Sequence, residues 1–276
     1  TKVKTVPSSD GQWDMARLLA KELTALGLVD VEISDYAVVT AKLPSNLPEG
    51  VKVPTVGWCA HMDTVDAGLS PDIHPQVIKN YQGGDICLNK EKDIWMRVAE
   101  HPEVERYIGD DLVVTHGTSV LGADNKSAIA NVMTALEIVI QENRPHGTIH
   151  VAFVPDEEIG LLGAKKIDFS KFPVDFAYTI DSCELGELVY QTFNAGGATL
   201  TIRGVTAHPM SAKGVLVNPT LIACDFVNAL DRKETPECTE DTEGFIWVHS
   251  IVSNPRVATV GIKIRDHNLE GYIHKK

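Results

Sequence analysis

Apolar positions recur at helical spacing in two segments of the chain. In residues 11–28 they follow one face and stop near Gly27, which predicts an amphipathic helix, and residues 126–141 predict a second one. Uninterrupted apolar runs predict buried strands at residues 55–60, 148–154 and 177–180. Because helices alternate with these strands, we expect an α/β fold in which helices cover a mixed, largely parallel sheet.

Two further segments have a different character. Residues 66–111 are rich in Gly, Pro, Asn and Asp, so we expect an excursion over the surface rather than core, able to shape an entrance. From about Asn194 the pattern is strand, helix, strand, strand, which predicts a separate α+β domain. We therefore expect a first domain at residues 1–193 and a second at residues 194–276.

Charge and cysteine content limit the classes of partner and compartment. The chain has 38 acidic and 25 basic residues and a net charge of -13, which argues against a nucleic-acid partner, because such proteins concentrate Lys and Arg on one face. No apolar run approaches the roughly 20 residues of a membrane span, so no membrane association is expected. Five scattered cysteines argue against a disulfide framework or a cysteine zinc site and favour a reducing cytoplasm.

Polar side chains follow the predicted strands at the points where the strands end. Taken alone, each has an ordinary explanation, since His-x-Asp occurs by chance and a Glu pair is usually a solvated turn. In an open α/β sheet, however, ligands gather beyond the carboxyl ends of the strands, where these side chains would meet. They are His61 and Asp63, Asp124 at the start of the second helix, Glu157 and Glu158, and Asp181.

One imidazole and several carboxylates form a donor set that suits zinc, and the acidic excess suits two cations bridged by one carboxylate. Two such ions can share a water, lower its pKa and polarise the carbonyl that it attacks, so the expected chemistry is amide hydrolysis. Asp63 either caps a helix or, two residues beyond a ligand, holds the imidazole tautomer. The adjacent side chains of Glu157 and Glu158 point differently, so one could coordinate metal while the other acts as general base.

Six short segments carry a resemblance to a known family: Pro7-Ser-Ser-Asp-Gly-Gln12, Ala60-His-Met-Asp-Thr64, Tyr81-Gln-Gly-Gly-Asp-Ile86, Leu121-Gly-Ala-Asp-Asn-Lys126, Phe153-Val-Pro-Asp-Glu-Glu158 and His208-Pro-Met-Ser-Ala-Lys-Gly214. They resemble the peptidase T family, tripeptide aminopeptidases within a wider family of dinuclear zinc peptidases. That wider family includes carboxypeptidase G-like enzymes and succinyl-diaminopimelate desuccinylase. The resemblance runs from end to end of the chain, and several segments lie outside the metal cluster.

The resemblance implies a role for each residue of the cluster. His61 and Asp181 would bind one zinc ion and Glu158 the other, and Asp124 would bridge them, which gives two Zn²⁺ in a complete site. The remaining two residues would be catalytic without binding metal. They are Glu157 as general base and Asp63 as the residue that orients the imidazole.

The resemblance also implies that residues 194–276 form an inserted α+β lid or dimerisation-type domain, through which a homodimer could form. His208 would contact substrate as the lid closes, although a surface histidine before a proline is its ordinary explanation. Asn194 and Lys213 match family positions beside it. The implied function is a cytoplasmic zinc aminopeptidase that releases the N-terminal residue from tripeptides.

The chain departs from the family at three points. Asn125 replaces an Asp that commonly follows the bridging residue, and Met210 replaces a usual Gly in the His-Pro motif. The family's final His ligand comes from a segment beyond the lid, and neither His267 nor His274 matches it, so we expect a chain truncated at both ends. The alternatives are a related zinc deacylase or dipeptidase, and an inactive fragment or binding protein without the last ligand.

Overall fold

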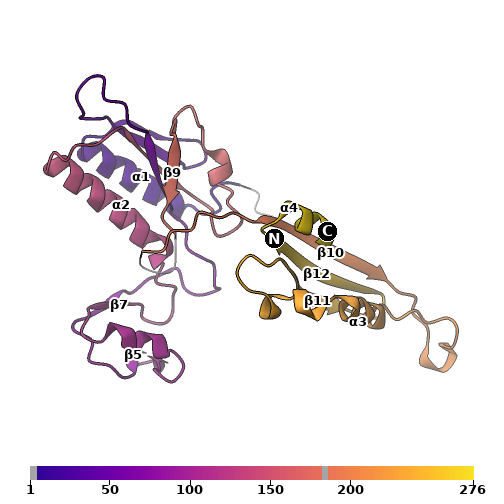
Figure 1. Ribbon diagram of the computed structural model, residues 1–276. Helices are drawn as coiled ribbons and strands as arrows, with labels where there is room; N and C mark the ends of the chain where they lie inside the picture. The colour runs from indigo at the N-terminus through magenta and orange to yellow at the C-terminus, as the bar shows by residue number, and fades with distance from the viewer. Residues whose placement is uncertain (1–4, 182–185) are drawn as a thin grey trace. The chain divides into compact units, whose positions relative to one another are not determined.

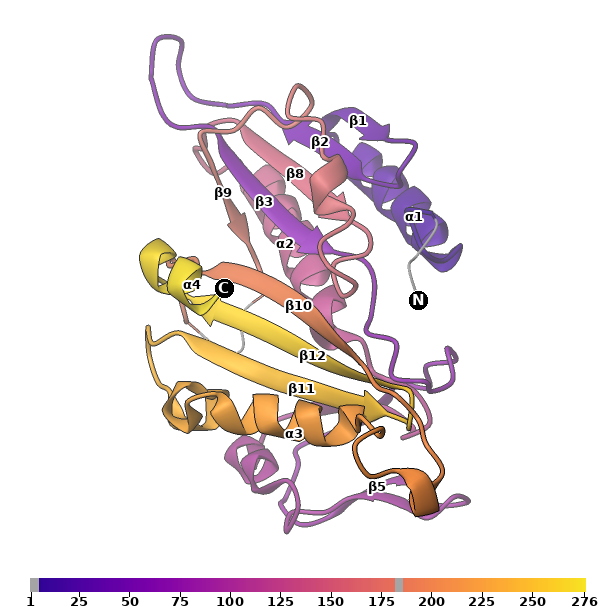
Figure 2. The ribbon, with the colours of Figure 1, turned by 90° about the vertical axis from the view of Figure 1, so that its right-hand side faces the viewer.

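The first unit of the protein is built on a five-stranded sheet. The computed structural model describes residues 5–181 and 186–276, and the chain divides into two units, residues 1–183 and 184–276. In their order across the sheet, the strands are β1 (Val29–Ile33), β2 (Val39–Leu43), β8 (Ile149–Val154), β3 (Val56–His61) and β9 (Phe176–Thr179) (Figure 2). β3 runs parallel to both β8 and β9, whereas β1 and β2 pair antiparallel. The sheet is therefore mixed, as expected, and its parallel part is confined to the three strands that lead into the candidate residues.

Helices α1 (Gly11–Ala25) and α2 (Ala123–Gln141) pack against this sheet (Figure 1). Their apolar faces form one buried cluster with the sheet, in which Leu23, Leu136 and Phe153 are fully buried. Each large apolar side chain buried in this way stabilises the fold by about 1.5–3 kcal/mol. The apolar positions that predicted the two helices are thus the ones that pack against the sheet, and they support the strands whose carboxyl ends carry the candidate residues.

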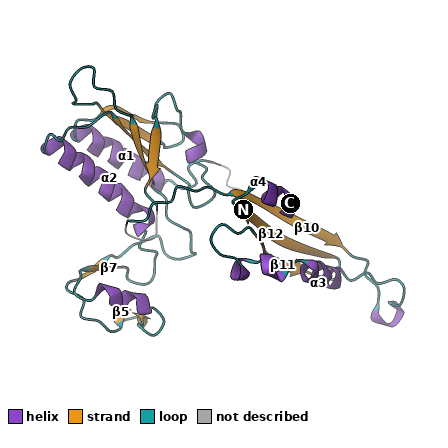
Figure 3. Ribbon diagram, viewed as in Figure 1, coloured by secondary structure: helices purple, strands orange, loops and turns teal. Residues whose placement is uncertain are grey.

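The segment between β3 and α2 is mostly loop (Figure 3). It also contains a small apolar cluster of Tyr81, Ile86 and Val104, so it is not only the surface excursion that its Gly, Asn and Asp content predicts. Short strands and a 3₁₀ helix bring these apolar residues together, and the many Gly, Pro, Asn and Asp residues of the segment hide these elements from a reading of the sequence. These elements are β4 (Gln76–Ile78), β5 (Ile86–Asn89), β6 (Ile94–Met96), η1 (Pro102–Tyr107) and β7 (Leu112–Val114).

The second unit is an antiparallel three-stranded sheet with helices. Across the sheet the strands are β10 (Asn194–Arg203), β12 (Val257–Asp266) and β11 (Phe245–Ser253). The helices are α3 (Pro219–Ala229), which lies along the sheet (Figure 2), and α4 (Leu269–Lys275). The Asn218 side chain accepts the backbone N–H of Thr220 at 3.0 Å and so begins α3. The unit has the strand, helix, strand, strand order that was predicted.

Short 3₁₀ turns complete the chain: η2 (Ala164–Lys166), η3 (Pro209–Ser211), η4 (Arg232–Glu234) and η5 (Pro236–Cys238). Within residues 5–181 and 186–276, no helix has the length and apolar character needed to cross a membrane. The cysteines in these ranges, Cys59, Cys87, Cys224 and Cys238, are all free thiols.

Candidate metal centre

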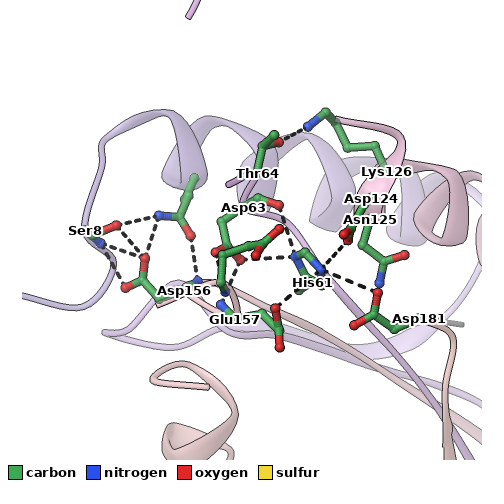
Figure 4. A network of polar contacts seen from close by, with 12 residues as sticks. Ser8, His61, Asp63, Thr64, Asp124, Asn125, Lys126, Asp156, Glu157 and Asp181 are labelled. Carbon is green, nitrogen blue, oxygen red and sulfur yellow. Dashed lines mark hydrogen bonds and ion pairs between the residues drawn. The ribbon is translucent and has the colours of Figure 1, made fainter. Parts of the chain in front are cut away.

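The carboxyl ends of adjacent parallel strands bring the candidate side chains together (Figure 4). β3 ends at His61, and the loop after β8 carries Glu157 and Glu158. Asp181 follows β9, and Asp124 lies in the first turn of α2, which packs beside β3. Since β3 lies between β8 and β9, its terminal histidine is flanked by carboxylates from both neighbours.

His61 Nε2 is the centre of the cluster. It lies 2.9 Å from Asp124 Oδ1 and 3.8 Å from a carboxylate oxygen of both Glu157 and Asp181. Two sets of described residues can each offer three ligand atoms within 4.8 Å of one another: His61 with Asp124 and Asp181, and His61 with Glu157 and Glu158. Imidazole nitrogen and carboxylate oxygen are donors that zinc accepts, so the residues present fit a divalent cation.

Asp63 contacts both His61 and the loop after β8. Its main-chain oxygen lies 3.0 Å from His61 Nδ1, and its Oδ1 lies 3.3 Å from the same nitrogen. Because two acceptors face Nδ1, that nitrogen carries a proton and Nε2 points into the carboxylate cluster. The Asp63 carboxylate also accepts the backbone N–H of Glu157 at 2.9 Å and of Glu158 at 3.0 Å. These contacts hold the Asp63 carboxylate between His61 and the loop after β8, and none of them caps a helix.

Asn125 and Lys126, the two residues that follow Asp124, tie the start of α2 to the segments just beyond β9 and β3. Asn125 Nδ2 donates to the main-chain oxygen of Ile180 at 2.9 Å, directly before Asp181. Lys126 Nζ donates to Thr64 Oγ1. Burial lowers the pKa of Lys126 below its usual value, and the nearby carboxylates of Asp63 and Asp124 offset only part of this effect. The departure at Asn125 thus supplies an amide donor that aligns the ends of α2 and β9.

Burial and mutual repulsion perturb the acidic groups of the cluster. Burial raises the pKa of Glu157, Glu158 and Asp181, and neighbouring carboxylates raise each pKa further. Burial alone would lower the pKa of His61, but the hydrogen bond and charge of Asp63, with the charges of Asp181 and Glu157, raise it to about 9. Such a cluster favours bound cations, because they relieve the repulsion between its carboxylates.

A second group of contacts next to the cluster was not predicted from the sequence. Asp156 is fully buried and accepts hydrogen bonds from Ser8 and Gln12, residues that precede and open α1 (Figure 4). Ser8, Gln12 and Asp156 all lie in segments that carry the family resemblance, and this was the available signal. The sequence alone did not indicate that the two segments touch.

Three predicted substrate residues belong to the second unit. Asn194 begins β10 and donates from Nδ2 to the main-chain oxygen of Asp266 at 3.1 Å. His208 is exposed, and its Nδ1 accepts the backbone N–H of Met210 at 3.3 Å at the start of η3. Lys213 is also exposed. Their proposed contact with substrate stays a prediction.

Known proteins resemble this chain along almost its whole length. A peptidase T-like protein of Rhizobium meliloti is 53% identical over 273 residues, which cover 99% of this chain and 66% of that protein. Peptidase T of Alkaliphilus oremlandii is 43% identical over 274 residues, covering 99% of this chain and 67% of that protein. The chain thus spans about two thirds of the length of these relatives.

A domain family matches the second unit, and a solved structure shares the fold of the chain. Residues 190–272 match the peptidase dimerisation domain family. The crystal structure of an aminopeptidase from Bacillus cereus matches 95% of this chain and 63% of its own, with a TM-score of 0.70 at 24% identity, and so shares its fold. On the identity and coverage of these relatives, the chain belongs to the peptidase T family.

Proposed function

We propose that this chain carries most of the active site of a zinc-dependent aminopeptidase that releases the N-terminal residue from tripeptides. The observation that supports the proposal is the convergence of His61 with four carboxylates at the carboxyl edge of the sheet. Membership of the peptidase T family supports the substrate class. Residues 1–193 would form the catalytic domain and residues 194–276 the lid, and a homodimer would form through the lid.

The proposed roles follow the donor chemistry of each group. His61 and Asp181 would hold one zinc ion and Glu158 the other, with Asp124 between them. When bound, the ions would supply an acidified water and polarise the peptide carbonyl. Glu157, whose pKa is raised by burial and neighbouring carboxylates, would take the proton of that water and pass it to the leaving amine.

The substrate would be positioned from the second unit. The imidazole of His208, the amide of Asn194 and the ammonium of Lys213 would bind polar groups of the peptide. We place the protein in a reducing cytoplasm, in keeping with the free thiols of the described cysteines.

One observation favours a second candidate function. Both sets of possible ligands among the described residues use His61, so filling one set leaves only Glu157 and Glu158 or only Asp124 and Asp181 for the other. A chain that binds a single ion, and acts as a binding protein or inactive fragment, is consistent with that sharing. A related deacylase or dipeptidase would share the same ligands and differ in substrate.

Zinc stoichiometry and turnover decide between these functions. The chain is loaded with zinc, dialysed and assayed by elemental analysis, then tested on tripeptides with free and with acylated N-termini. The proposal expects close to two ions per chain and chelator-sensitive hydrolysis of the free tripeptides only. Preference for acylated peptides would indicate the deacylase, and one ion without turnover would indicate the inactive chain.

Two variants control this experiment. Glu157→Gln is expected to retain zinc but lose hydrolysis, since it removes a proton acceptor and no proposed ligand. Asp14→Asn makes the same kind of change on the exposed side of α1 and is expected to leave both measurements unchanged. Equal loss of zinc in both variants would contradict the assigned roles.

A further inference from the structure

The turn after β8 is closed by its own backbone. Asp156 has a positive φ of 55°, in the left-handed region. The main-chain oxygen of Asp156 accepts the N–H of Leu162 at 2.9 Å, and that of Pro155 accepts the N–H of Gly163 at 3.1 Å. These bonds define the turn, but they leave the N–H groups of residues 156, 157 and 158 facing outward from it.

All three of these amides are bound by side chains from other parts of the chain. Gln12 Oε1 accepts the N–H of Asp156 at 3.0 Å. Asp63 accepts the next two, from Glu157 at 2.9 Å and Glu158 at 3.0 Å. Three consecutive peptide groups are thus held from two sides, by Gln12 of α1 and by Asp63, which lies two residues beyond the end of β3.

The Asp156 side chain completes the contact with α1. Its Oδ1 accepts hydrogen bonds from Ser8 Oγ at 2.6 Å and from Gln12 Nε2 at 2.9 Å. Its Oδ2 accepts a hydrogen bond from the Ser8 backbone N–H at 2.9 Å. Gln12 and Asp156 therefore each donate to and accept from the other across 144 residues of sequence. Gln12 is itself 5% exposed and Asp156 is fully buried.

Burial of a carboxylate is costly, and the groups that donate to Asp156 are all neutral. The turn itself does not need this buried side chain, because two backbone hydrogen bonds already close the turn. What the Asp156 side chain adds is hydrogen bonds from three donor groups, two of Ser8 and one of Gln12, that fix the direction of the residue next to Glu157.

We propose that Gln12 and Asp156 are positioning residues that set the orientation of Glu157 and Glu158. Their side-chain hydrogen bonds run to each other, to Ser8 and Ser9 and to the backbone N–H of Asp156, and none of these reaches a proposed metal ligand, so the two residues would act through the backbone of the loop. This inference rests on the proposed function for the roles of the two glutamates. It extends that function by giving the start of α1, with Ser8, a part in assembling the site.

The test uses the whole chain and measures zinc affinity by competition with a chromogenic chelator. Gln12→Ala and Asp156→Asn are each expected to weaken zinc binding about tenfold, a loss typical of residues that orient ligands. The matched controls are Gln141→Ala at the exposed end of α2 and Asp14→Asn on α1, and both should bind as the wild type. Thermal unfolding of each variant is recorded in parallel.

A reciprocal exchange separates positioning from general stability. Gln12→Glu alone sets two carboxylates against each other and should weaken zinc binding by about tenfold or more. Combined with Asp156→Asn it restores a donor opposite an acceptor, so the double variant should return to within about threefold of the wild type. Variants with a lower melting temperature but unchanged zinc affinity would overturn the proposal, as would a double variant no better than the worse single one.

Amide hydrogen exchange keeps the two proposals distinguishable. In Gln12→Ala, residues 156–158 should exchange faster while the rest of the sheet is unchanged, and equal protection would overturn the positioning role. A wild-type chain that binds zinc but hydrolyses no tripeptide would contradict the proposed function and leave the positioning result standing. If the wild type binds no zinc, the proposed function fails, and the exchange measurement alone decides whether the loop is held by Gln12.

Discussion

Replacing Asp63 by asparagine is the sharpest single test of the cluster. The substitution preserves the size of the side chain but removes one negative charge and one of two acceptor oxygens. In the wild type these oxygens accept the N–H groups of Glu157 and Glu158, at 2.9 and 3.0 Å. An asparagine can accept only one of them, and its own amide N–H₂ then faces the other.

The magnitude follows from the burial of that carboxylate, which is 9% exposed. A hydrogen bond to a charged group contributes about 1.5–3 kcal/mol, and little of it is screened at such a site, so we expect Asp63→Asn to lower the free energy of unfolding by about 2–3 kcal/mol. Zinc affinity should fall about 10–100-fold, because His61 Nδ1 loses the charged one of the two acceptors that face it and the loop that carries Glu157 and Glu158 loses one of its backbone contacts. Asp63→Ala, which leaves both amides unpaired, should lose more in both measurements.

Urea unfolding of the chelator-treated chain measures the first quantity, and competition with a chromogenic chelator measures the second. Asp14→Asn on the exposed face of α1 is the control for loss of a negative charge. An Asp63→Asn variant that unfolds within about 0.5 kcal/mol of the wild type, a change usual for surface substitutions, and binds zinc equally well would refute the reasoning.

Three further predictions concern other parts of the chain. A Cβ at Gly163 would overlap a backbone carbonyl across the turn after β8, so Gly163→Ala should destabilise the first unit by about 1–3 kcal/mol, measured by urea unfolding. Burial raises the pKa of Asp266, but hydrogen bonds that include one from Lys275 outweigh it and hold that pKa below its usual value of 3.8. The stabilisation is therefore present above that value and lost as the pH falls through the lowered pKa, so Asp266→Asn should flatten the acid side of the unfolding profile of the second unit, followed by circular dichroism. Burial raises the pKa of Cys59 to about 11, so iodoacetamide at pH 8 should modify the exposed Cys224 well before Cys59, as read by peptide mass spectrometry.

The ends of the parallel strands were predictable because their signal is local. β3 is an apolar run that stops at a histidine, and β8 stops just before a pair of glutamates. Parallel strands present their carboxyl ends at one edge, so position along each strand was enough to bring His61, Glu157 and Asp181 together. The antiparallel placement of β1 and β2 was not predictable in this way, since pairing direction depends on connections and not on periodicity.

The contacts between α1 and the loop after β8 could not be predicted for a different reason. Gln12 and Asp156 are separated by 144 residues, and nothing in the spacing of either segment indicates a partner. A glutamine on a helix and an aspartate in a turn are both common at solvent-exposed positions. Only their burial in the fold distinguishes them, because a buried polar group must find its hydrogen bonds inside the protein.

The acidic groups of the cluster divide into two classes by what faces them. Glu157, Glu158 and Asp181 face one another, and burial with repulsion raises each pKa, so these groups gain most from bound cations. Asp63 is buried too, but His61 and two backbone N–H groups face it, and they lower its pKa despite burial. Its orientation therefore does not depend on a metal ion. A loop held by such a residue can keep its backbone in place before any ion binds, which reduces the ordering that metal binding would otherwise require.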